Sequence, residues 1–162
     1  MRPLAILIAV LFLAPAAYAK PPHVNGLAWI GGLELRFDAN RWEVNGAGNA
    51  YDVFCSAPDC ARTAIAITIA GEADAACAPE ALAFADANPA FPGRLDRFNH
   101  AGLAFLVAEG DFGCRNLSGG PVRACTTHDG KTYLFDAPGQ HCHTAWHAGE
   151  RVGEILRGLK PR

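Results

Sequence analysis

Six cysteines in a chain of 162 residues constrain this protein most, because all six lie downstream of a segment with the features of a secretory signal. Arg2 gives that segment a positive start, residues 4–13 form an uncharged apolar run, and Ala17-Tyr18-Ala19 fits the small-x-small cleavage rule. We expect residues 1–19 to be a signal peptide and residues 20–162 to form a single secreted domain. Cysteines in an exported domain typically pair, so the sequence predicts a disulfide-stapled protein that is periplasmic or secreted.

The spacing of the cysteines predicts one cross-strand bond. Cys114 and Cys125 lie symmetrically about Gly119-Gly120, a dipeptide typical of a turn. A hairpin centred on these glycines would place the two cysteines opposite each other, where Cα atoms about 4.5 Å apart are close enough to be bridged.

The spacing of the cysteines gives weaker support for the other two predicted pairs. Cys55 and Cys60 flank a short loop that contains the turn residues Pro58-Asp59, so we expect a Cys55–Cys60 bond that clips the loop. Cys77 and Cys142 are then paired by elimination, although six cysteines allow many other pairings.

Hydropathy patterns predict an α+β fold built on an antiparallel sheet of hairpins and a meander. Strands are expected where apolar and polar residues alternate or β-branched residues gather, at residues 33–37, 42–44, 51–54, 64–69, 103–107, 122–127 and 132–135. The last three form the meander, and Asp129-Gly130 between two of them is typical of a type I′ hairpin.

Two helices are expected on one face of this sheet. Pro79 suits the first position of a mid-chain helix over residues 79–87, which Asn88-Pro89 would end. An amphipathic C-terminal helix is expected from Glu150 onward, with apolar residues at helical spacing: Val152, Ile155, Leu156 and Leu159. Trp42 is expected in the core, whereas Trp29 fits either the core or a ligand groove.

Charge and composition exclude some classes of function. The net charge is -2 and the sequence has no basic cluster, so we expect no nucleic-acid partner. After signal cleavage no apolar run is long enough to span a bilayer. No G-x-S-x-G motif or phosphate-binding glycine loop is present, and paired cysteines would leave no thiol nucleophile. Whether the protein is an enzyme stays open, with a non-enzymatic role favoured.

A dense group of histidines offers the one candidate metal site. His141, His143 and His147 lie within seven residues, and the first two point to the same side of an extended segment. Three neutral imidazoles can bind zinc or copper. In the competing interpretation these histidines are exposed hydrogen-bonding groups, and we then expect no cofactor.

Two resemblances to known families add to these predictions. The order of strands 33–37, 42–44 and 64–69, a meander and a closing helix at 154–159 resembles the PsbP-like and DcrB-like α+β domains, which implies a fold and no catalytic residues. Residues 55–60 followed by a strand are similar to the disulfide-clipped loop of periplasmic lysozyme inhibitors. In that family the loop carries a histidine into the lysozyme cleft, whereas this loop carries Asp59.

Together these features predict a non-enzymatic periplasmic binding or accessory protein. One specific form of this role is an inhibitor-like partner of another envelope protein. Pro58 and Asp59 are the candidate binding residues, and the expected partner is a periplasmic protein or a small ligand. The alternative is a metal-binding protein or metalloenzyme that uses the histidine group. A structural envelope component, with neither partner nor metal, is the third class.

Overall fold

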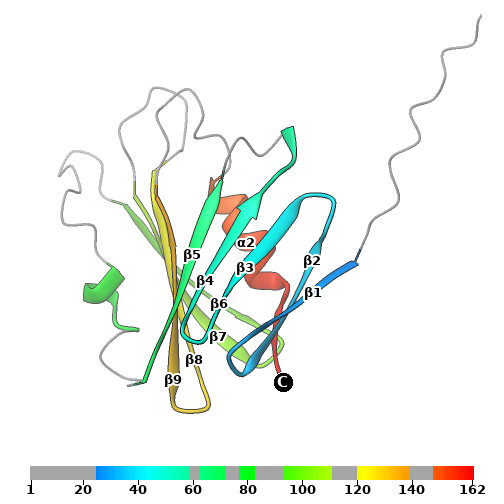
Figure 1. The fold of residues 1–162 in the computed structure, drawn as a ribbon. Coiled ribbons are helices and arrows are strands. Elements are labelled where there is room, and N and C mark those ends of the chain that lie inside the picture. The colour runs from blue at the N-terminus through cyan, green and yellow to red at the C-terminus, as the bar shows by residue number, and fades with distance from the viewer. Residues whose placement is uncertain (1–24, 59–62, 72–76, 83–92, 111–119, 139–147) are drawn as a thin grey trace, which may run out of the picture.

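The described part of the chain consists mainly of β-strands (Figure 1). The computed structural model describes residues 25–58, 63–71, 77–82, 93–110, 120–138 and 148–162. In chain order its elements are β1 (Asn25–Ile30), β2 (Leu33–Asp38), β3 (Trp42–Ala47), β4 (Ala50–Cys55), β5 (Ala64–Ala70), the 3₁₀ helix η2 (Pro79–Leu82), β6 (Arg94–His100), β7 (Leu103–Glu109), β8 (Val122–His128), β9 (Lys131–Ala137), α2 (Ala148–Arg157) and β10 (Leu159–Pro161).

A seven-stranded antiparallel sheet runs in the order β3-β4-β5-β9-β8-β7-β6. The predicted meander is its β7-β8-β9 part, and the predicted turn is confirmed. Asp129 and Gly130 have φ values of 54° and 67°, as a type I′ turn requires, and His128 pairs with Lys131 across it. Ala101-Gly102 makes a similar turn between β6 and β7, with φ values of 49° and 82°.

A second, smaller antiparallel sheet has the order β1-β2-β10. The turn between β1 and β2 is Gly31-Gly32, and Gly31 adopts a φ of 58°. The backbone N–H of Gly32 donates to the hydroxyl oxygen of Tyr133, 2.9 Å away and fully buried on β9. This bond ties the tip of the small sheet to the centre of the large one.

The predicted C-terminal helix is confirmed as α2, and it joins the two sheets. Its apolar side packs into one core with residues of both sheets, and Glu150 in the first turn and Arg157 in the last complement the helix dipole. The helix and the strand after it contribute four fully or almost fully buried side chains: Val152, Ile155, Leu156 and Leu159. Trp42, 1% exposed, lies in the same core as predicted.

The predicted α+β class is wrong, because the chain is mostly β. Where a mid-chain helix was expected over residues 79–87, the described residues form only the four-residue 3₁₀ helix Pro79–Leu82. Residues 83–87 lie outside the described part. Leu82 is buried against the outer face of β7 and β8, and a disulfide from Cys77 to Cys125 ties the same segment to β8, so the segment is anchored without a long helix. Within the described residues, no helix has the length and apolar character that a membrane crossing requires.

Two of the predicted disulfide pairings are also wrong. Cys77 is bonded to Cys125, with Cα atoms 5.5 Å apart, which excludes both Cys114–Cys125 and Cys77–Cys142. The reason is the register of the hairpin: Glu109 pairs with Val122, so Cys125 lies opposite Leu106. The pairing of β7 with β8 is therefore not symmetric about residues 119 and 120.

Cys55 is disulfide-bonded as well. The other cysteines, Cys60, Cys114 and Cys142, lie outside the described residues, so the Cys55–Cys60 pairing stays a prediction.

We predict that replacing the Cys77–Cys125 bond by Cys77→Ala and Cys125→Ala lowers the free energy of unfolding by about 4 kcal/mol. The bond spans 48 residues, and a crosslink of that span restricts the unfolded chain by roughly this amount. Urea unfolding of the oxidised proteins measures the difference. Reductant should then destabilise the double variant less than the wild type, and equal losses would contradict the assignment.

We predict that Tyr133→Phe destabilises the protein by about 1 kcal/mol, because the half-buried Gly32 N–H loses its acceptor. Amide hydrogen exchange at Gly32 should accelerate more than exchange within β2. Tyr51→Phe on β4, where a partly buried ring packs against the core, is the matched control. Equal exchange at Gly32 in both variants would show that Tyr133 does not hold the turn.

Candidate functional site

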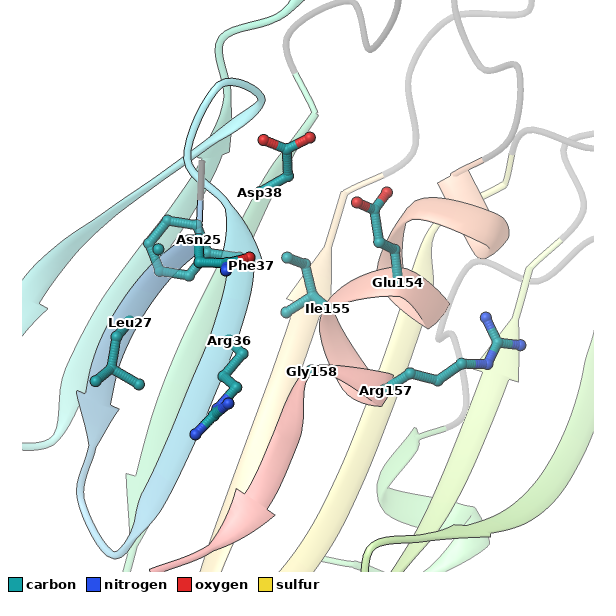
Figure 2. A pocket seen from close by; sticks show the side chains of 10 residues that line it. Asn25, Leu27, Arg36, Phe37, Asp38, Glu154, Ile155, Arg157 and Gly158 are labelled. Atoms are coloured by element: carbon teal, nitrogen blue, oxygen red, sulfur yellow. The ribbon is translucent and has the colours of Figure 1, made fainter. Parts of the chain in front are cut away.

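A groove of about 920 Å³ lies between the open end of the β1-β2 hairpin and the last turns of α2 (Figure 2). We call it the β1–α2 groove. Its apolar lining comes from Leu27, Phe37 and Ile155. Its polar lining has two cations and two carboxylates, with one of each on either wall: Arg36 and Asp38 on β2, Glu154 and Arg157 on α2.

The groove exists because α2 and β2 meet closely at one end only. The backbone N–H of Arg36 donates to the carbonyl oxygen of Gly158 at 2.9 Å. A side chain at Gly158 would collide with the Arg36 backbone, so glycine is what permits this approach. β10 pairs with β2 only at residues 33–35. Beyond residue 35, the edge of β2 on the α2 side therefore faces the groove, while its other edge stays paired with β1.

Glu154 links the α2 wall to the core. Its Oε1 accepts a hydrogen bond of 3.1 Å from the indole N–H of Trp42, and its Oε2 lies 3.9 Å from a guanidinium nitrogen of Arg41. Since Trp42 is buried in the core, this bond fixes the position of the carboxylate at the rim of the groove. The Glu154 carboxylate on the α2 wall is therefore held in one position.

The outer surface of the small sheet carries a second group of charges. Glu34 on β2 accepts from Arg36 at 2.6 Å and lies 3.1 Å from the ammonium of Lys160, and its side chain is only 12% exposed. The hydrogen bonds from Arg36 and Lys160 together hold the pKa of Glu34 below its ordinary value of 4.5.

We predict that this network makes stability depend on pH in acid. Because the pKa of Glu34 is lower in the folded state, its contribution is present above the unfolded value of 4.5 and is lost as pH falls through the folded pKa. Glu34→Gln should lower the melting temperature at neutral pH and flatten its dependence on pH below 4.5. Thermal unfolding from neutral to acid pH tests this, and parallel curves for the two proteins would contradict it.

Two smaller hollows accompany the groove. One of about 470 Å³ lies beside Cys77 on the outer face of β6, β7 and β8, next to Arg97 and Asn99. The other, of about 250 Å³, lies between Glu109 and the start of α2. The β1–α2 groove exceeds both in volume and brings together elements far apart in sequence, so we take it as the candidate functional site.

Of the residues chosen from the sequence, Pro58 is described and does not line this groove. It is exposed in the segment that follows β4, and Asp59 lies outside the described residues. His141, His143 and His147 lie outside them too, so the metal site stays a prediction. In the described part of the chain, no three His, Cys, Asp or Glu side chains gather closely enough to hold a metal ion.

The sequence did not identify the groove residues, because a hydropathy pattern does not show which face of a strand meets which element until the strand pairing is known. No strand was expected before residue 33, yet β1 spans Asn25–Ile30. The signal was present: Gly31-Gly32 separates two strand-like runs by two residues, which is typical of a hairpin.

No protein-family profile and no curated protein matches the chain. Among solved structures, it is similar to the solution structure of cyanobacterial PsbP (CyanoP) from Synechocystis sp. PCC 6803, with a TM-score of 0.48 and 14% sequence identity. The alignment covers 92% of this chain and 100% of that chain. The resemblance to PsbP-like domains is one of fold, and no inference about function follows from it.

Proposed function

We propose that this protein is an exported binding or accessory protein that holds a segment of a partner protein in the β1–α2 groove. The observation that carries the proposal is the groove itself, with an apolar lining between walls that each bear one cation and one carboxylate. Its volume of about 920 Å³ falls in the range typical of ligand sites.

The mixed lining favours a polypeptide segment over a purely apolar ligand. Leu27, Phe37 and Ile155 would contact apolar side chains. Arg157 and Glu154 offer a donor and an acceptor of charge-assisted hydrogen bonds within a turn of one another. A peptide carries apolar groups, charges and backbone amides together, and so fits both halves of the lining.

The disulfides favour export of the chain to a compartment in which such bonds persist. The Cys77–Cys125 bond and the bonded state of Cys55 favour an oxidising compartment. Together with the signal features of residues 1–19, they support the periplasm as the place of action.

Site-specific photo-crosslinking tests the proposal. A photoreactive residue at Leu27, 53% exposed in the groove, should capture a specific partner from periplasmic extract. The same residue at Leu95, 46% exposed on β6 and remote from the groove, is the matched control. Equal capture at both positions, or none at Leu27, would overturn the proposal. A small molecule seen instead by native mass spectrometry would exclude a polypeptide partner.

With the partner in hand, Arg157→Ala should weaken binding about tenfold, the effect of losing a charge-assisted hydrogen bond. Arg97→Ala on β6 is the control, since Arg97 is exposed and far from the groove. Titration calorimetry gives both dissociation constants. Unchanged affinity in the Arg157 variant would show that the partner binds elsewhere.

A further inference from the structure

The small sheet exposes two large apolar side chains on its outer face. Leu27 is 53% exposed and Trp29, two residues further along β1, is 46% exposed. Alternate residues of a strand point to the same side, so both belong to one face, whereas Ile30 points into the core. Leucine and tryptophan so close together on an open surface favour a contact that removes them from water.

Positive charge surrounds these side chains. In the strand register Arg36 lies opposite Leu27, Glu34 opposite Trp29, and Lys160 opposite Glu34. The guanidinium of Arg162 lies 4.7 Å from the centre of the Trp29 ring. We call the group formed by Leu27, Trp29, Glu34, Arg36, Lys160 and Arg162 the Trp29 patch.

The Trp29 patch holds three cations against the single carboxylate of Glu34, which Arg36 and Lys160 already neutralise in part. Adding Asp38 at the far end of β2 leaves an excess of one positive side-chain charge. The whole chain has a net charge of -2, so this excess is local. The complementary surface is therefore negatively charged and able to accept apolar groups.

An anionic lipid surface fits these features better than an acidic protein does. Tryptophan favours the headgroup region of a bilayer, and arginine and lysine beside it reach lipid phosphates with their long side chains. A standard protein interface takes about 20 to 30 residues from each side. The Trp29 patch is much smaller, whereas docking on lipid scales with the few side chains that enter the headgroups.

We propose that the Trp29 patch docks the mature protein on an anionic phospholipid surface, with Leu27 and Trp29 in the headgroup region and Arg36, Lys160 and Arg162 against phosphates. This goes beyond the proposed function. Leu27 and Arg36 border both the Trp29 patch and the β1–α2 groove, whereas Trp29, Lys160 and Arg162 do not line the groove, so docking can be tested at these three even if the groove holds no partner.

Vesicle binding tests docking directly. The oxidised mature protein should co-sediment with vesicles of phosphatidylethanolamine and phosphatidylglycerol, and far less with vesicles of phosphatidylcholine. Added salt should weaken the binding because the cations act by charge. Lys160→Gln should reduce affinity about fivefold, the effect of one cation near an anionic surface. Trp29→Ala should reduce it further.

Matched controls use residues outside the Trp29 patch. Phe54→Ala removes another aromatic side chain, 40% exposed on β4, and Arg97→Gln removes an exposed cation on β6. Both should bind vesicles as the wild type does, and melting temperatures check that every variant is folded. Absence of binding to anionic vesicles, or equal loss in the controls, would overturn the proposal. Tighter binding to polyglutamate than to vesicles would assign the patch to an acidic protein and would overturn it too.

Discussion

The seven-stranded sheet turns a continuous apolar face toward α2, and the rest of the structure depends on how that face is covered. Ile65, Ile67 and Phe135 are almost fully buried on it, and each such side chain is worth about 1.5–3 kcal/mol when removed from water. One amphipathic helix of ten residues cannot cover seven strands. The small sheet completes the cover, because Leu33, Leu35 and Leu159 enter the same core.

The β1–α2 groove follows from this way of covering the core. The helix ends where the chain returns to pair with β2, and the carbonyl oxygen of Gly158, directly after α2, accepts from the backbone N–H of Arg36. β10 is three residues long and leaves the far half of β2 without a strand on that side. β10 starts opposite Leu35 and runs away from residues 36–38, so the position of the groove is set by where α2 ends and β10 begins.

Local signals in the sequence predicted local structure, and non-local pairing had to come from the structure. The turn at Asp129-Gly130 and the helix α2 are determined by residues close together in the sequence, and both predictions are confirmed. β6 was missed, since Arg94, Asp96 and Arg97 mask its alternation. The disulfide prediction failed by register: the strand pairing places Cys125 opposite Leu106 and leaves it open to Cys77 from another part of the chain. The groove joins residues from both ends of the chain, which no window of sequence contains.

The orientation of β1 shows why its exposed residues carry information. Hydrophobicity alone would turn Leu27 and Trp29 inward, yet Gly26 and Ala28 face the core side. The two-residue turn fixes the register, and β2 must direct Leu33 and Leu35 inward. The ring of Phe37 occupies the place where a side chain at Gly26 would lie. In this register, turning Trp29 inward would turn both leucines of β2 outward, whereas a one-residue slip of β1 alone would bury Trp29 and expel Ile30. The fold therefore keeps Leu27 and Trp29 exposed to water. Binding at this face would remove this unfavourable exposure of apolar surface.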